Sequence, residues 1–454
     1  MLAGASAKLS DIFSARHDGS SAPTSQRAYD LSLVLVALAL MSIGLIVVTS
    51  ASMPVAEREY ASPFYFSIRH GAYLLIALTV AAGVMQVPMH FWRVTNPYLL
   101  LLAIALLLAV LVVGRSINGS TRWIVIGPMT LQPAEPAKLF FFTYLAGYLV
   151  RRYEEVTENL KGFVKPLVVL FVLATMLLLQ PDFGTVVVML TTTMGLLFLA
   201  GAPLWQFFGV VFVGLAAVVS LIVFEEYRMR RVTSFLDPWA DPFGSGYQLT
   251  QSLMAYGRGS WFGQGLGNSY QKLEFLTQAH SDFIMAILAE ELGFAGVLAV
   301  LGLIFFLVIR ALKIGNQAIA RHRPFEGYLA YAIGIWLSFQ TAVNIGASVG
   351  ILPTKGLTLP LISYGGTSLI VTMITIALLL RIDFELRVDG VQALDRGDKP
   401  RRLKGPAKGP AKGPADTRPT STSKATSTAA GQPAADKQQL REVLENVEQE
   451  ARHD

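Results

Sequence analysis

The chain has 454 residues, of which 53% are hydrophobic and 15% are charged, and its formal net charge is +6. Soluble domains carry about 25% charged residues, so this composition excludes an ordinary soluble protein and indicates an integral membrane protein. The positive charge does not indicate nucleic-acid binding, because much of it lies after residue 387 and in short loops between apolar runs. The chain has no cysteine, which excludes disulfides and thiolate metal sites.

The N-terminal segment, residues 1–29, is polar and is predicted to be cytoplasmic. The first apolar run, which begins at residue 30, is about 20 residues long, whereas the apolar core of a cleaved signal peptide is shorter. We therefore interpret this run as a retained helix.

Apolar runs then follow one another as far as residue 381. A bilayer core of about 30 Å requires roughly 20 apolar residues per helix. The runs that approach this length are 30–51, 69–87, 97–114, 132–150, 166–180, 183–201, 205–224, 282–310, 326–350 and 358–381. The sequence predicts an all-α polytopic membrane protein with about ten transmembrane helices, whose membrane domain covers residues 30–387.

The distribution of Lys and Arg predicts the orientation. When the N-terminus is placed in the cytoplasm, the short inside segments hold more Lys and Arg than the short outside loops, as the positive-inside rule requires. Both termini are then cytoplasmic. The long loop, which we define as residues 225–281, lies outside the cytoplasm and precedes the eighth span.

Residues 388–454 are predicted to form a disordered, basic cytoplasmic tail. Lys-Gly-Pro-Ala recurs from Lys404 to Ala415, and a Ser-, Thr- and Ala-rich stretch follows. Such a composition cannot bury a core. Near the end, four apolar residues are spaced as on one helix face, which favours either a short docking helix or a weakly formed solvated one; they are Leu440, Val443, Leu444 and Val447.

A first polar cluster lies between the third and fourth spans, from Arg115 through Arg122 to Lys138. Glu135 and Lys138 are three residues apart on a predicted helix, so they can share a face and form an ion pair. Two interpretations stay open for this pair. It is either a structural ion pair or part of the polar wall of an outward-facing cavity.

A second cluster, Gln180-Pro-Asp182, separates the fifth and sixth spans. Proline and the nearby glycine predict a tight turn. Asp182 is predicted to cap the helix that follows it.

The long loop and the entry to the last span carry the remaining polar motifs. The loop combines Trp, Tyr, Asn and Gln with several glycines, a composition that suits sugar binding and also ordinary loops at a membrane interface. The segment 346–366 has two prolines and several glycines at a helix junction. It predicts a broken or re-entrant backbone, which membranes tolerate only inside protein or beside a cavity.

Asp282 lies where the long loop meets an apolar helix. Its spacing favours a helix N-cap, where a carboxylate accepts hydrogen bonds from free backbone N–H groups. The competing interpretation is a partly desolvated carboxylate that accepts a proton. Two turns deeper, at least one of Glu290 and Glu291 must face the protein interior, because lipid exposure of a carboxylate is costly.

Nucleotide-binding loops, zinc-protease motifs and nucleophile elbows are absent from the sequence. The polar clusters all face outward in the predicted topology, which disfavours direct use of cytoplasmic nucleotides. No compact carboxylate cluster dictates a metal site.

The polar motifs of the chain are long and ordered. They are Asn118-Gly-Ser-Thr-Arg122-Trp with Gln132-Pro-Ala-Glu135, Pro238-Trp with Asp241-Pro-Phe-Gly-Ser-Gly-Tyr-Gln, Gly263-Gln-Gly-Leu-Gly-Asn268-Ser, His280-Ser-Asp282-Phe-Ile, and Leu352-Pro-Thr-Lys-Gly-Leu-Thr-Leu-Pro-Leu-Ile-Ser-Tyr-Gly-Gly366. Together they resemble those of the SEDS family (shape, elongation, division and sporulation proteins), and the resemblance covers roughly residues 30–387. The sequence of the long loop is most similar to that of the division member of the family, and the elongation member is the nearest alternative.

The resemblance implies a peptidoglycan glycosyltransferase that polymerises lipid II at the outer face of the bacterial cytoplasmic membrane, at the division septum. The family's essential carboxylate lies in the large outer loop, and the matching position is Asp282. The sequence departs from the family just before it, since Thr277, Gln278 and Ser281 stand where proline, glutamate and threonine are common.

Under this interpretation Asp282 is the catalytic base and undecaprenyl pyrophosphate is the leaving group. Cations would stabilise the charge on that group. The candidate substrate-binding residues are Arg115, Arg122, Glu135, Lys138, Arg258, Gln264, Asn268, Lys272, His280, Lys355, Ser363 and Tyr364. No residue is assigned to a metal, although a divalent cation such as Mg²⁺ or Mn²⁺ would serve the same purpose.

The resemblance also implies partners: a class B penicillin-binding transpeptidase and other divisome proteins. Alternative functions are a lipid II flippase, an elongation-type polymerase and a scaffold that recruits division proteins. The outward position of the polar motifs, and the lack of a clear internal repeat, favour chemistry at the interface over transport.

Overall fold

The structure is a computed structural model that describes residues 29–117, 120–127, 129–223, 237–244, 246–273, 275–352 and 356–395. The predicted N-terminal segment except Tyr29, all but the first residues of the predicted tail, and Lys355 lie outside these ranges. The described part of the chain belongs to one compact unit.

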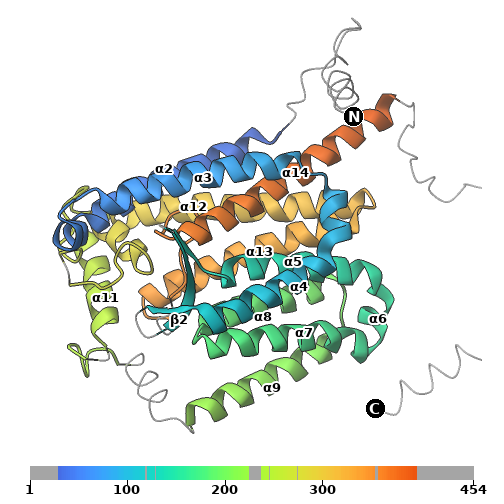
Figure 1. The fold of residues 1–454 in the computed structure, drawn as a ribbon, viewed down its shortest axis with the longest axis horizontal. Helices are drawn as coiled ribbons and strands as arrows, with labels where there is room; N and C mark the ends of the chain where they lie inside the picture. The colour runs from blue at the N-terminus through green and yellow to red at the C-terminus, as the bar shows by residue number, and fades with distance from the viewer. Residues whose placement is uncertain are drawn as a thin grey trace, which may run out of the picture. The chain divides into compact units, whose positions relative to one another are not determined.

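Long helices dominate this unit and run side by side (Figure 1). They are α2 (Leu31–Tyr60), α3 (Tyr65–Gln86), α4 (Met89–Val113), α5 (Ala134–Arg151), α7 (Leu160–Leu179), α8 (Phe183–Leu199), α9 (Leu204–Val223), α12 (Ile284–Ala320), α13 (Pro324–Ser348) and α14 (Gly366–Asp395). Two short helices are α6 (Tyr153–Glu158) and α11 (Tyr247–Gly259). The all-α membrane class predicted from hydropathy is confirmed.

Six of the described helices are long and apolar enough to cross a membrane, namely α2, α3, α4, α7, α12 and α13. The other long helices, α5, α8, α9 and α14, fall where the remaining spans are predicted. The count of ten spans stays a prediction.

The last predicted span begins later than expected. We expected it at residue 358, whereas α14 begins at Gly366. The residues before it are irregular and buried, among them Leu359 and Ile362, and Leu361 has a φ of 63°. A built Cβ on Gly44 of α2 would lie 2.8 Å from Ile362 Cα, so only glycine permits this close approach. The predicted broken backbone, buried in protein, is confirmed.

A small antiparallel sheet joins α4 to α5, and the sequence did not predict it. It consists of β1 (Arg115–Ile117), β2 (Ser120–Ile126) and β3 (Met129–Leu131), in that order. Arg115 pairs with Trp123, and Ile124 pairs with Leu131. Figure 1 shows β2 and α11 at one end of the helices and α6 at the other, and we call the former the sheet end.

The long loop contains a helix, α11, which the sequence did not predict. This helix and the loop after it pack against α12 where Gly293 breaks the helical backbone, with φ 72° and ψ −172°. The break exposes backbone groups that the loop satisfies: Phe294 N donates to Ser260 O at 2.9 Å, and Gln264 N donates to Glu290 O at 2.9 Å.

Candidate active site at the sheet end

Asp282 lies two residues before α12, between the long loop and the bundle. The N-cap of α12 is Phe283, and no side chain caps this helix. The N-cap interpretation of Asp282 is therefore wrong, because the helix begins one residue later than the spacing suggested. The carboxylate of Asp282 is free for another role, and the side chain is half-buried.

The backbone around Asp282 is held by the segment that precedes α14. Ser363 Oγ donates to Ser281 O at 2.6 Å, and Tyr364 N donates to His280 O at 3.0 Å. Ser363 Oγ also accepts from its own segment, from Leu359 N at 2.8 Å. The turn before α12 and the irregular segment before α14 thus hold each other in place.

Asn344 of α13 fixes the third carbonyl of this stretch. Its Nδ2 donates to Asp282 O at 3.0 Å and to Leu357 O at 2.6 Å, and the side chain is buried. One amide group therefore joins the carboxylate-bearing turn to the segment opposite it. Asn344 was not predicted, although a polar residue inside an apolar span is a signal that could have found it.

Arg122 of β2 faces the carboxylate of Asp282 across Gly356. A Cβ built on Gly356 would lie 3.2 Å from Asp282 Oδ2 and 3.5 Å from Arg122 Nη1. Arg122 is itself held by the turn between α7 and α8, because its Nε donates to Gln180 O at 3.1 Å and its Nη2 donates to Pro181 O. Strand β2 thus places the guanidinium of Arg122 near the carboxylate of Asp282.

Burial raises the pKa of the Asp282 carboxyl to about 7, since desolvation disfavours the charged form. The guanidinium of Arg122 acts in the opposite direction, and the nearby carboxylate of Asp182 raises the pKa further. Asp182 caps α8 as predicted: Thr185 N donates to it at 3.4 Å and Thr185 Oγ1 at 2.8 Å. A carboxylate with such a pKa is suited to accept a proton at neutral pH.

The ring of His280 packs against aromatic side chains beside the turn that carries Asp282. Its ring stacks on Phe66 at 4.9 Å and meets Tyr364 edge-on at 5.4 Å. Burial lowers the pKa of His280 to about 4, so the ring is neutral at pH 7.

Glu135 and Lys138 form the predicted ion pair, with Lys138 Nζ 2.9 Å from Glu135 Oε1. Both side chains are buried, and Lys138 is 0% exposed. Lys138 Nζ also donates to Gln340 Oε1 at 3.0 Å, and Gln340 Nε2 donates to Thr358 O at 2.9 Å. These bonds link the pair to the segment before α14, which also positions the backbone around Asp282.

The other polar residues of the long loop gather around the break in α12. Lys272 Nζ lies 2.9 Å from Glu291 Oε1, and Arg258 Nη1 lies 3.4 Å from Glu290 Oε1. Both Glu290 and Glu291 are buried, as predicted for at least one of them. These acids lie about two helical turns beyond Asp282. Their ion pairs with Lys272 and Arg258 compensate the buried charges and fasten the long loop to α12.

The structure thus divides the predicted site residues among several places. Asp282, Arg122, His280, Ser363 and Tyr364 lie together at the sheet end. Arg258, Gln264, Asn268 and Lys272 lie at the break in α12, where Gln264 Nε2 donates to Arg258 O and Asn268 Nδ2 donates to Gln264 O. Glu135 and Lys138 are inside the bundle, Arg115 is exposed on β1, and Lys355 lies outside the described residues.

Among the described residues, no group of three or more His, Asp or Glu side chains could hold a metal ion. Among these residues, Asp182 is the carboxylate whose charge acts on Asp282.

A protein-family model described as "cell cycle protein", which covers FtsW, RodA and SpoVE, matches residues 30–388. The chain belongs to this family. The match covers nearly all of the helical unit, and it confirms the resemblance to SEDS proteins found in the motifs.

Curated relatives within the family are close in sequence. A probable peptidoglycan glycosyltransferase FtsW from Alteromonas naphthalenivorans is 74% identical over 403 residues, which are 89% of this chain and 78% of the relative. A protein of the same name from Escherichia coli O6:H1 is 55% identical over 371 residues, which are 82% of this chain and 90% of the relative. The chain is therefore similar to the division-type members.

Solved structures share the fold. The rod shape determining protein RodA of Thermus thermophilus is 29% identical with a TM-score of 0.58, and the match covers 79% of this chain and 97% of RodA. A chain from a study of how a peptidoglycan synthase complex coordinates polymerization and crosslinking is 28% identical with a TM-score of 0.65, covering 79% of this chain and 98% of that chain.

Proposed function

We propose that this protein is a peptidoglycan glycosyltransferase that polymerises lipid II during septal cell-wall synthesis. Relatives that are 55–74% identical carry the name probable peptidoglycan glycosyltransferase FtsW. The observation that carries the proposal is the half-buried carboxylate of Asp282, which faces Arg122 and has a pKa near neutrality.

The proposed reaction joins two lipid-linked sugars. The C4 hydroxyl of the acceptor's N-acetylglucosamine attacks C1 of the donor's N-acetylmuramic acid, and the bond from C1 to the undecaprenyl pyrophosphate oxygen breaks. Asp282 accepts the hydroxyl proton as the new bond forms. A positioned base of matched pKa contributes about 10²–10⁴-fold to such a step.

The leaving pyrophosphate gains negative charge as the C1–O bond breaks. A fixed cation near it stabilises the transition state more than the bound substrate, and this difference accelerates the reaction. Arg122 is the cation that faces Asp282, and two backbone carbonyls hold it in place. In the proposed reaction, Arg122 Nη1 is the group that contacts the pyrophosphate.

A divalent cation such as Mg²⁺ or Mn²⁺ would add to this neutralisation. Magnesium is commonly held by one or two carboxylates together with substrate phosphates. Asp182 lies near Asp282, but it is buried and its two carboxylate oxygens already accept from Thr185 N and Thr185 Oγ1, so the described residues offer no carboxylate pair for such an ion.

The proposed location is the bacterial cytoplasmic membrane at the division septum, with both termini in the cytoplasm and the sheet end outside. The basic residues of the short loops support this orientation. The proposed partners are a class B penicillin-binding transpeptidase and other divisome proteins, and the similarity to a chain of a peptidoglycan synthase complex supports the transpeptidase.

A lipid II flippase is the less favoured alternative. A transport path needs polar groups that line a hydrated cavity through the bundle. The buried pair of Glu135 and Lys138 instead contacts protein groups, with Lys138 0% exposed.

The test is to incubate the purified full-length protein with lipid II, alone and with its transpeptidase, and to resolve the glycan products on a gel. We expect glycan strands in at least one arm. If neither arm makes glycan while the protein moves lipid II across vesicle membranes, the flippase account replaces this one.

A further inference from the structure

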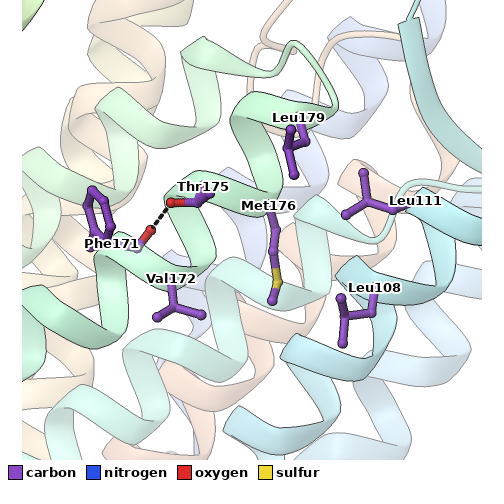
Figure 2. Close-up of a pocket in the computed structure, with 7 residues that line it drawn as sticks. All are labelled: Leu108, Leu111, Phe171, Val172, Thr175, Met176 and Leu179. Carbon is purple, nitrogen blue, oxygen red and sulfur yellow. Dashed lines mark hydrogen bonds between the residues drawn. The ribbon is translucent and has the colours of Figure 1, made fainter.

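An apolar groove lies between α4 and α7, on the membrane-spanning part of the bundle. Its volume is about 330 Å³, and Figure 2 shows the side chains that line it. These are Leu108 and Leu111 from α4, and Phe171, Val172, Thr175, Met176 and Leu179 from α7.

The groove offers an almost wholly apolar lining to a ligand. Its single polar side chain, Thr175, donates its hydroxyl to Phe171 O at 2.8 Å within α7 (Figure 2). Phe171 and Leu179 are 71% and 66% exposed, so the groove opens toward the lipid. From Phe171 to Leu179 it follows α7 for about 12 Å, which suits a segment of a long aliphatic chain.

The end of the groove nearest the sheet leads to the candidate active site. Leu179 is followed directly by Gln180, whose backbone oxygen accepts from Arg122 Nε at 3.1 Å. Gln180 Nε2 in turn donates to Leu107 O at 3.2 Å, beside Leu108 of the groove. Gln180 therefore lies next to the groove residues of both helices and also holds Arg122, the cation that faces Asp282.

We propose that this groove binds the isoprenoid chain of a lipid-linked sugar pyrophosphate, with the pyrophosphate at Arg122. The inference rests on the function proposed above and adds the place where the lipid part of the substrate lies. Both parts of the ligand match their surroundings, because a branched hydrocarbon meets an apolar groove and an anion meets a guanidinium at its end.

The proposed role of the groove is to position the substrate. A hydrocarbon chain gains no hydrophobic free energy when it leaves lipid for an apolar groove, so dispersion contacts and shape must hold it. Confining the first part of the chain brings the pyrophosphate and its sugar to Arg122 and Asp282. Misplacement of a reacting group by about 1 Å can cost about 10²-fold in rate.

The test fills the groove and varies the substrate chain. Thr175→Trp places an indole in the groove, and Val168→Trp is the matched control, because Val168 is also exposed on α7 but does not line the groove. Each purified protein is assayed with lipid II that carries the full-length isoprenoid and with an analogue that carries a short one. If Thr175→Trp does not fold, Val172→Trp replaces it.

We expect Thr175→Trp to lower the ratio of kcat/KM for the long-chain substrate to that for the short-chain substrate by about tenfold. Val168→Trp should leave this ratio unchanged. An unchanged ratio in Thr175→Trp would overturn the inference and leave the groove to ordinary membrane lipids, whereas a wild-type protein inactive on both substrates would sink the proposed function itself.

Discussion

Arg122 and Asp282 face each other over Gly356, at a point where a single methyl group would touch both of them. Asp282 Oδ2 would lie 3.2 Å, and Arg122 Nη1 3.5 Å, from a Cβ on that glycine. The two groups come from distant parts of the sequence, because Arg122 lies in β2 and Asp282 directly follows the long loop. Their arrangement gives a proton acceptor and a fixed cation in one small space.

The first prediction concerns pH. Only the ionised form of Asp282 accepts a proton, and the pKa of this carboxyl is about 7, so kcat/KM should rise with pH and level off above 7. Arg122 lowers this pKa, and therefore Arg122→Gln should move the acidic limb of the profile to higher pH, besides reducing the maximal rate. The measurement is the pH–rate profile of glycan synthesis.

Arg152→Gln serves as the control for this profile. Arg152 pairs with Glu155 in α6, at the end of the bundle away from the sheet. Its loss should not move the acidic limb. A limb that stays in place in Arg122→Gln as well would show that Arg122 does not act on the titrating group.

The second prediction concerns the space over Gly356. Gly356→Ala should lower kcat by about tenfold or more, because its methyl group would lie only 3.2 Å from Asp282 Oδ2 and displace that carboxylate, while its contact with Arg122 Nη1 at 3.5 Å is an ordinary one. Gly83→Ala in α3 is the matched control, since a Cβ there meets nothing within 4 Å. Equal activity of the two variants would mean that the arrangement over Gly356 is not the reacting one.

The third prediction concerns the buried pair of Glu135 and Lys138. Lys138→Ala leaves Glu135 buried without its cation, which should cost about 3–5 kcal/mol of stability. The double variant Glu135→Ala with Lys138→Ala should lose less, because neither charge remains buried. Thermal unfolding of the purified proteins measures both.

Turnover per folded molecule separates this structural role from substrate binding. If Lys138→Ala unfolds at the wild-type temperature but turns over more slowly, then Lys138 belongs to a substrate cavity and the structural interpretation fails.

Hydropathy predicted the positions of the helices, because each span must satisfy its backbone internally and present apolar side chains to lipid. Short-range rules predicted the ion pair of Glu135 and Lys138 and the cap by Asp182, since each depends on spacing within one turn. The same kind of rule failed at Asp282, where α12 begins at Ile284 and no side chain caps it.

The contacts that form the site could not be predicted in this way, because they join distant parts of the sequence. Arg122 binds the carbonyl of a residue 58 positions away, and Ser363 binds one 82 positions away. The small sheet that carries Arg122 was also missed, since its strands are only three to seven residues long. Its polar motif was visible, but the motif does not reveal the pairing.

The role of Asp282 as the base is tested by the rate at which Asp282→Asn polymerises lipid II. Asparagine keeps the shape of the side chain and cannot accept the proton, so we expect the rate to fall by at least about 10²-fold, with thermal stability no lower than in the wild type. A folded Asp282→Asn protein that polymerises lipid II at a rate close to that of the wild type would contradict the assignment of Asp282 as the base.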